Sequence, residues 1–131
     1  MRNDSEQQKS LLSVCLNDSI RHTRHLLLQN AGYEVESVLN VRDLRSACKR
    51  RKFDLVIVCH SLDSRAKQFL GANMWLLCRN TPVLELCIVS PEMKTGHHLI
   101  NPSPEALLES VESIVGVAFS DERRKRQTGS S

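Results

Sequence analysis

Cys59 and His60 are the residues in this chain best placed to do chemistry. They follow the segment 53–58, an apolar run of strand length that is rich in β-branched residues. Such a run is typical of a strand buried on both faces of a parallel sheet. In open α/β sheets, ligands and reactive groups lie at the carboxyl ends of the strands. Cys59 is therefore a candidate for a reactive or metal-binding thiol at the functional edge of a sheet.

Other groupings that catalysis requires are missing from the sequence. The five glycines are scattered and form no phosphate-binding loop. No nucleophile stands beside a base, and no carboxylates are paired for acid–base chemistry. His22 and His25 share a helix face, but two histidines without a third ligand favour a solvated surface. We therefore expect no enzyme activity, no small-molecule substrate and no cofactor.

Composition is that of a single globular domain. The 131 residues are 40% hydrophobic and 25% charged. No apolar run approaches the ~20 residues of a membrane span, and the polar residues 1–10 are not a secretory signal. The five cysteines are odd in number and lack CxxC spacing, which favours a reducing compartment over a disulfide framework. We expect a cytoplasmic location and no membrane partner.

The charge of the chain gathers at one end. Of the net charge of +3, residues 120–131 supply +2, because the four basic residues 123–126 outnumber Asp121 and Glu122 by two. The body is close to neutral, so a nucleic-acid partner is not expected. Residues 1–9 and the basic tail 119–131 are expected to be disordered, which leaves residues 10–118 as the domain.

Hydrophobic periodicity predicts alternating strands and helices across this domain. Asn40 is a helix cap, Gly32 suits the end of a helix, and Ser103 followed by Pro104 is a strong helix start. Alternation with short connections indicates a parallel sheet covered on both faces. The predicted strands are 11–16, 33–39, 53–58, 83–89 and 98–100, and the predicted helices are 20–31, 41–52, 64–79 and 104–117.

The order and spacing of several motifs resemble the receiver domain of two-component response regulators over residues 11–116. The resemblance implies a doubly wound α/β fold, with a flavodoxin-like five-stranded parallel sheet of order 2-1-3-4-5. The motifs that carry it are Val14-Cys15-Leu16-Asn17 with Arg21, Gly32-Tyr33-Glu34-Val35, Phe53-Asp54-Leu55-Val56-Ile57-Val58, Thr81-Pro82-Val83 and Leu99-Ile100-Asn101-Pro102.

The same resemblance implies that the family's chemistry has been lost. Its two Mg²⁺-binding acids fall on Cys15 and Leu16, its phosphoacceptor aspartate on Cys59, its Thr or Ser on Cys87, and its Lys on Asn101. A thiolate is a poor Mg²⁺ ligand, Leu is none, and an acyl phosphate requires a carboxylate. The resemblance thus implies a degenerate receiver.

Three details of the resemblance bear on the fold and the site. A shifted placement would retain one acid, Asp18, but the spacing from Gly32 and the match at Arg21 argue against that shift. Only eight residues, 90–97, join the fourth and fifth strands. A parallel crossover normally needs ~10–12 residues, so the fourth helix of the family is expected to be reduced or absent. The resemblance leaves the Asn101–Pro102 peptide bond open between cis and trans.

In a receiver fold, Cys15, Cys59 and Cys87 would converge at one edge of the sheet. One hypothesis is a soft-metal or redox site with a further ligand from His60, His97 or His98. The other is that free cysteines act as small hydrophobes in a vacated polar pocket. We favour the second, because the spacing does not match a closed zinc site.

The sequence therefore predicts an atypical, stand-alone receiver-like signalling domain of the two-component or phosphorelay type. It would lack the phosphoacceptor Asp and act as a protein-interaction module for an unidentified signalling protein. The alternative is a thiol- or metal-based sensor that uses the pocket of Cys15, Cys59 and Cys87.

Overall fold

Five strands and four helices make up the part of the chain that the computed structural model describes, residues 8–78, 80–93 and 96–116. The predicted disordered segments lie largely outside these residues. The elements are β1(Ser10–Val14), α2(Asp18–Asn30), β2(Glu34–Val38), α3(Val41–Arg50), β3(Leu55–Val58), α4(Ser64–Leu77), β4(Val83–Cys87), β5(His97–Ile100) and α5(Pro104–Val115).

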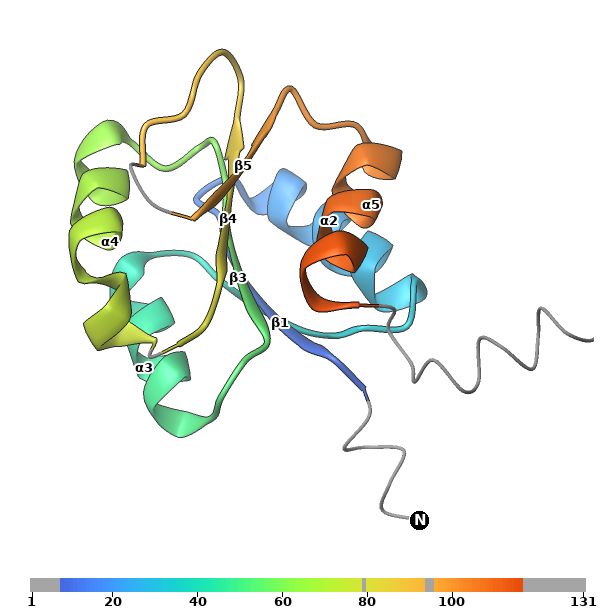
Figure 1. The fold of residues 1–131 in the computed structure, drawn as a ribbon, viewed down its shortest axis with the longest axis horizontal. Coiled ribbons are helices and arrows are strands. Elements are labelled where there is room, and N and C mark those ends of the chain that lie inside the picture. Colours follow the sequence, from blue (N-terminus) through green and yellow to red (C-terminus); the bar gives the residue numbers. More distant parts are fainter. Residues whose placement is uncertain (1–7, 79, 94–95, 117–131) are drawn as a thin grey trace, which may run out of the picture.

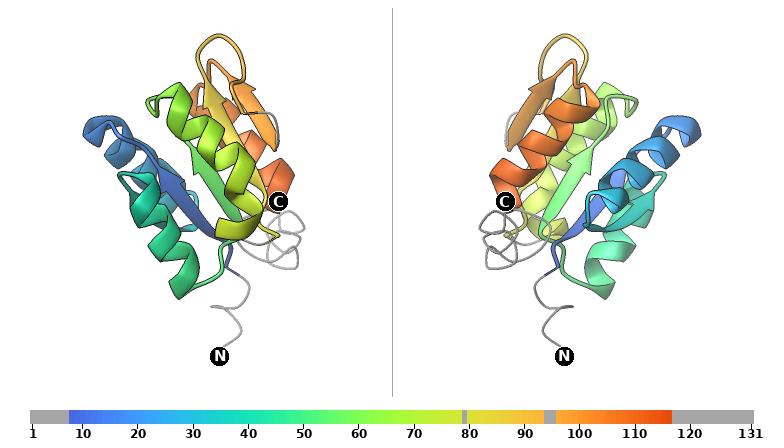
Figure 2. Two further views of the ribbon diagram at one scale, coloured as in Figure 1. Left: turned by 90° about the vertical axis from the view of Figure 1, so that its left-hand side faces the viewer. Right: turned by 90° about the vertical axis from the view of Figure 1, so that its right-hand side faces the viewer.

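The strands form one parallel sheet in the order β2-β1-β3-β4-β5, as the sequence predicted. Helices α3 and α4 cover one face of the sheet, and α2 and α5 cover the other (Figure 1). The side views show the sheet between these two layers of helices (Figure 2). This arrangement brings the carboxyl ends of all five strands to one edge of the molecule.

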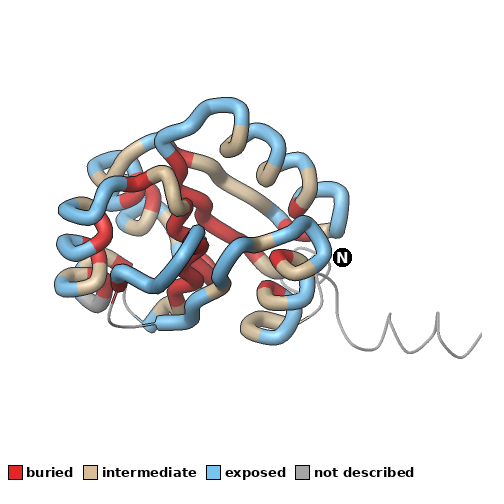
Figure 3. The backbone as a smooth tube through the Cα atoms, turned by 90° about the horizontal axis from the view of Figure 1, so that it is seen from above, coloured by how far each residue is buried: buried red, intermediate tan, exposed pale blue. Residues whose placement is uncertain are grey.

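The core is divided by the sheet into two apolar clusters. Leu12, Val56 and Leu70 belong to the cluster beneath α3 and α4, and Leu11, Leu55 and Leu107 to the one beneath α2 and α5. Alternate residues of β1 and β3 thus face opposite clusters, which explains why β3 is apolar throughout and β1 is apolar except at Ser10 and Ser13. Figure 3 shows the buried residues along the central strands and the exposed ones on the outer turns of the helices.

Side-chain caps fix where the helices begin. Asn17 accepts from the backbone N–H of Ile20, and Asn40 caps α3 in the same way. The predicted cap of the third helix, Ser64, is wrong by one residue, because the Asp63 carboxylate caps α4 by accepting from Ala66. The first, second and fourth predicted strands extend one or two residues too far, because apolar side chains continue beyond the last strand residue, whereas the third and fifth end where predicted.

The connection between β4 and β5 contains no helix among its described residues 88–93 and 96, as its length predicted. Its backbone is held from within the fold, because the N–H groups of Glu92 and Met93 both donate to the Glu85 carboxylate. The connection returns through Gly96, at φ +90°, where a Cβ would lie 2.9 Å from the carbonyl oxygen of Val83. Only glycine fits there without a shift of the backbone.

The cysteine pattern favoured a reducing compartment over a disulfide framework, but two of the five cysteines are bonded to each other. Cys48, near the end of α3, is bonded to Cys78 at the C-cap of α4, with a Cα–Cα distance of 5.5 Å. These residues are 30 positions apart and share no motif, so only the packing of α3 against α4 brings them together. Cys15, Cys59 and Cys87 are free and buried. Cytosolic disulfides are usually transient or regulatory, so the cytoplasmic location stays a prediction.

No helix among the described residues is long and apolar enough to span a membrane.

Candidate thiol site at the carboxyl edge of the sheet

The thiols of Cys15 and Cys59 meet just beyond the ends of β1 and β3. These strands are neighbours in the sheet, with Val14 and Val58 as register partners, and the N–H of Cys59 donates to the carbonyl of Val14 at 3.0 Å. The two cysteines are therefore the next pair along the same register. Their Sγ atoms lie 2.7 Å apart, with Cys15 donating to Cys59, and both side chains are buried.

Cys59 accepts further hydrogen bonds in addition to the one from Cys15. The Arg24 guanidinium, from α2, lies 3.1 Å from the Cys59 Sγ through Nη1. Ser61 donates to the same sulfur from its hydroxyl at 3.3 Å and from its backbone N–H at 3.5 Å. One thiol thus receives a cation and several donors, which favours its thiolate form.

This environment separates the pKa values of the two thiols. The hydrogen bond from Cys15 lowers the pKa of Cys59 from 9.0 to about 5, assisted by Ser61 and by the charge of Arg24 against the opposing effect of burial. The pKa of Cys15 is raised, because it holds the proton that it donates to Cys59 and because it is buried. The opposite directions of the two shifts favour a pair with one thiolate, on Cys59, and one thiol, on Cys15.

The other predicted site residues have different neighbours. The Cys87 Sγ donates to the carbonyl of Glu85 at 3.8 Å, and burial raises the pKa of this thiol. Leu16 is 51% exposed and donates its N–H to the Ser61 hydroxyl. The N–H of Asn101 donates to the carbonyl of Cys87 at 2.6 Å. Of the three free thiols, the contacts join Cys15 to Cys59 and place Cys87 beside Glu85.

Asn101 ends β5 in the left-handed region, at φ +56°, a conformation that Asn tolerates better than most residues. The described residues include no cis peptide bond, so Asn101–Pro102 is trans. Asp18, the acid of the shifted alignment, lies in the first turn of α2 with a largely exposed side chain and pairs with Arg21. The Asp18 side chain therefore faces solvent beside Arg21. This position supports the alignment that assigns the family's two acidic positions to Cys15 and Leu16.

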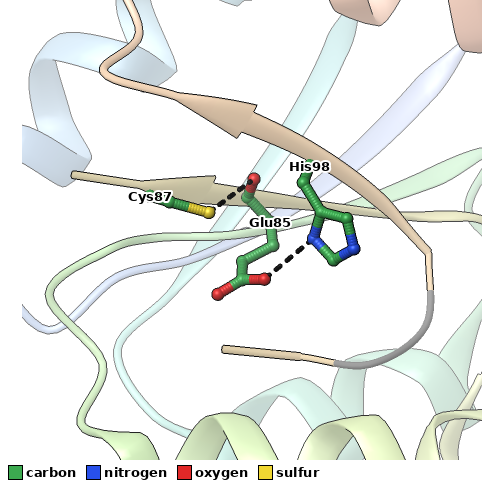
Figure 4. A group of neighbouring side chains, drawn as sticks. All are labelled: Glu85, Cys87 and His98. Atoms are coloured by element: carbon green, nitrogen blue, oxygen red, sulfur yellow. Dashed lines mark hydrogen bonds and ion pairs between the residues drawn. The ribbon is translucent and has the colours of Figure 1, made fainter. Parts of the chain in front are cut away.

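A second cluster of charged groups, which sequence analysis missed, surrounds Glu85 on β4. Lys67 of α4 lies 3.0 Å from its carboxylate, and both side chains are almost wholly buried. His98 of β5 contacts the other carboxylate oxygen at 2.9 Å (Figure 4). Burial raises the pKa of Glu85, but the N–H groups of Glu92 and Met93 and the Lys67 ammonium outweigh it, so that pKa lies below its ordinary value. The only sequence signal was a single acid inside the apolar run 83–87.

The group formed by Glu85, Cys87 and His98 has ligand atoms within 4.8 Å of one another. A metal ion there would have to displace Lys67 and the two backbone donors, which already satisfy the carboxylate. The buried ammonium would also repel a cation. We therefore interpret this cluster as an ion-pair network that anchors the β4–β5 connection.

A mostly apolar cleft of about 290 Å³ lies beside the thiol pair, between α2 and the start of α5. Arg24 lines this cleft and contacts Cys59, so its half-buried side chain separates the cleft from the thiolate. The remaining lining residues are Ser19, Ile20, Thr23, Leu27, Pro102, Ser103, Pro104 and Leu107.

No protein-family model matches the sequence, and no curated protein matches it. Solved structures do match. The chemotaxis protein CheY4 of Vibrio cholerae is 28% identical, with a TM-score of 0.69 over 82% of this chain and 98% of its own. A two-component response regulator from Clostridium difficile is 16% identical, with a TM-score of 0.71 over 82% of this chain and 95% of its own.

A third match bears on the metal site. The receiver domain of the sensor histidine kinase PA1611 from Pseudomonas aeruginosa PAO1 is 16% identical, with a TM-score of 0.68 over 83% of this chain and 98% of its own, and its structure has a magnesium ion in the active-site cleft. In this chain Cys15, Leu16 and Cys59 supply no hard oxygen side chain at the corresponding edge, so the site does not fit Mg²⁺. These comparisons support the resemblance read from the sequence: the fold is that of the CheY-like receiver domains of response regulators.

Proposed function

We propose that this chain, whose fold is that of the response regulator receiver family, is a signalling domain that acts through protein contacts and without an aspartyl phosphate. The observation that carries this proposal is the thiol pair at the family's reactive edge. Cys15 and Cys59 contact each other, and Arg24 lies against Cys59, where the family has carboxylates. An acyl phosphate needs a carboxylate, and a phosphoryl group would also lose its Lys partner, since Asn101 occupies that position.

Exposed apolar side chains support contact with a protein. Ile88 and Val89, directly after β4, are 53% and 80% exposed, and Ile100 at the end of β5 is 49% exposed. Cys87 and Ile100 are register partners, so these three residues belong to neighbouring strand ends. Apolar side chains gathered at one place on a surface mark interaction sites. The partner that we propose is a signalling protein.

Incubation with acetyl phosphate and Mg²⁺ is expected to leave the mass of the intact protein unchanged, because no carboxylate occupies the reactive position. Mass spectrometry measures this directly, with a receiver domain that has its aspartate as the positive control. A phosphoryl group on the protein, with a site mapped by digestion, would overturn the first part of the proposal.

Substitution of Val89 by Glu is expected to abolish capture of a protein partner from a lysate, because a charge would enter an apolar contact. Leu76→Glu on α4 is the matched control, since Leu76 is also exposed (68%) but lies on a different element. Quantitative mass spectrometry compares the captured proteins for wild type and both variants. A protein retained equally by wild type and both variants would mean that the contact lies elsewhere on the surface. If the immobilised wild-type protein captured nothing more than empty resin, the result would count against an interaction module.

A thiol-based sensor is the second candidate function. It is favoured by one observation, the 2.7 Å contact between the Cys15 and Cys59 thiols beside a guanidinium. If Cys59 served only to fill the core as a small apolar side chain, its sulfur would not need the Arg24 guanidinium beside it.

A further inference from the structure

We propose that Cys59 and Cys15 form a reversible dithiol–disulfide couple that is oxidised by a hydroperoxide, with Cys59 as the attacking thiol and Cys15 as the resolving thiol. This inference rests on the second candidate function, the thiol sensor, and is independent of the proposed contact at Val89. It assigns a modification site to two residues that the receiver chemistry leaves without a role.

The backbone already meets the geometric requirement for this disulfide. Cys15 and Cys59 continue the parallel register of Val14 and Val58, and neighbouring strands lie about 4.7–4.9 Å apart. Disulfides have Cα–Cα distances of about 4.4–6.8 Å. The Sγ–Sγ distance of 2.7 Å exceeds the roughly 2.05 Å of an S–S bond by about 0.7 Å, so small side-chain rotations suffice.

The surroundings assign different roles to the two thiols. Arg24 and Ser61 donate to the Cys59 sulfur, which stabilises a thiolate, the form of cysteine that attacks peroxides. Cys15 donates its proton to Cys59 and receives no cation, so it is held as a thiol until Cys59 has reacted. Cys87 contacts a backbone carbonyl and the buried Glu85, which disfavour a thiolate.

Access to the buried pair runs through the cleft between α2 and α5. Cys15 is 0% and Cys59 1% exposed, so a large oxidant cannot reach either sulfur in this conformation. The Arg24 side chain both contacts Cys59 and lines the cleft of about 290 Å³. Displacement of this one side chain would open a path from the cleft to Cys59, and we therefore expect hydrogen peroxide to react faster than the larger glutathione disulfide.

The reaction balances in two steps. The Cys59 thiolate attacks one peroxide oxygen, the O–O bond breaks, and Cys59 sulfenic acid and hydroxide form. The Cys15 thiol then loses its proton as its sulfur attacks Cys59, and water leaves as the S–S bond forms. Together, two thiols and one hydrogen peroxide give one disulfide and two waters, and an external dithiol reverses the change. Oxidation removes the thiolate charge of Cys59, so the Arg24 guanidinium of α2 loses its anionic partner.

Stoichiometric hydrogen peroxide, added to the reduced full-length chain, tests the couple. After alkylation and digestion, we expect a cross-linked peptide pair containing Cys15 and Cys59. In Cys15→Ser, dimedone added together with denaturant should trap a sulfenic acid on Cys59, whereas Cys59→Ser should give neither product. Cys87→Ser is the matched control and should form the Cys15–Cys59 cross-link at the wild-type rate. Arg24→Met should slow the reaction below about pH 5, because at such pH values each unit by which it raises the pKa of Cys59 lowers the thiolate fraction about tenfold.

Several outcomes would overturn the proposal: no oxidation of Cys59 by peroxide, an irreversible sulfinic acid on Cys59 in the wild type, or a cross-link that includes Cys87. Faster reaction with glutathione disulfide than with hydrogen peroxide would also overturn it. Mapping of Cys48 and Cys78 in the same digest separates their disulfide from the new one. The mass measurement with acetyl phosphate and the capture experiment with Val89→Glu do not depend on these thiols, so either proposal can fail alone.

Discussion

Replacement of Lys67 by Met is expected to lower the free energy of unfolding by about 3–5 kcal/mol, which is the usual cost of leaving one member of a buried ion pair alone. Lys67 Nζ lies 3.0 Å from the Glu85 carboxylate, and the Glu85 side chain is fully buried. Without Lys67, the carboxylate keeps its two backbone donors and His98 but loses its buried positive charge. The cost is a large share of the roughly 5–15 kcal/mol of a typical domain.

Urea unfolding followed by circular dichroism measures this effect, and two further variants control it. The double variant Lys67→Met/Glu85→Gln removes both charges and is expected to recover most of the loss, because the uncompensated carboxylate is gone while the amide oxygen still accepts from the N–H groups of Glu92 and Met93. Lys52→Met changes an exposed lysine and is expected to alter stability by less than about 0.5 kcal/mol. If the single and double variants lose the same free energy, the ion pair is not the cause.

The thiolate of Cys59 is expected to titrate with a midpoint near pH 5, against the 9.0 of an ordinary cysteine. The cause is the hydrogen bond from Cys15, with smaller contributions from Ser61 and Arg24. At pH 7 Cys59 would then be almost wholly thiolate, whereas an ordinary thiol, whose pKa of 9.0 lies above that pH, would be only about 1% thiolate, a difference of about 100-fold. The ultraviolet absorbance of the thiolate, recorded for wild type against Cys59→Ser, measures the midpoint.

Variants of the neighbouring residues check the cause. Cys15→Ala removes the principal donor and should move the midpoint upward, and Arg24→Met should move it in the same direction. Cys87→Ser should leave the difference curve unchanged, since the pKa of Cys87 is raised and this thiol stays protonated at neutral pH. A midpoint near 9 in the wild type would mean that Cys59 is an inert core thiol.

The same shift predicts how stability depends on pH. The folded pKa of Cys59 lies below the unfolded value, so between about pH 5 and 9 the unfolded chain binds more protons at this residue. The stabilisation from Cys59 is fully present above pH 9 and is lost as the pH falls through about 5. The difference in unfolding free energy between wild type and Cys59→Ser should therefore increase with pH across this window.

The succession of strands and helices along the chain and the short β4–β5 connection were predictable because their signals are local, whereas the strand order within the sheet was implied by the family resemblance. The apolar run 53–58, the Asn40 cap and the eight residues between the predicted fourth and fifth strands each describe one element or one connection. Individual strand ends were less predictable. Leu16, Ile88 and Val89 continue the apolar pattern beyond the ladder, so the sequence counted them as strand although they are exposed.

The candidate site was predictable only in part. The sequence placed Cys15, Cys59 and Cys87 at strand ends, but it treated them as equivalent. The register of the sheet determines which of these thiols can meet. Val58 pairs with Val14 of β1 and with Glu85 of β4. Cys15 is therefore level with Cys59, whereas Cys87 comes one position later along its strand. Arg24 reaches Cys59 from a helix 35 residues away in the sequence.

By itself, the sequence determined the α/β class, the order of the elements and a β4–β5 connection without a helix among its described residues, because residue type and spacing along one segment carry that information. Only the tertiary structure decided which thiols meet, that Lys67 neutralises Glu85, and that Cys48 bonds to Cys78. These are contacts between different elements, 18 to 44 residues apart. They depend on strand register and helix packing, which no periodicity within a single element specifies.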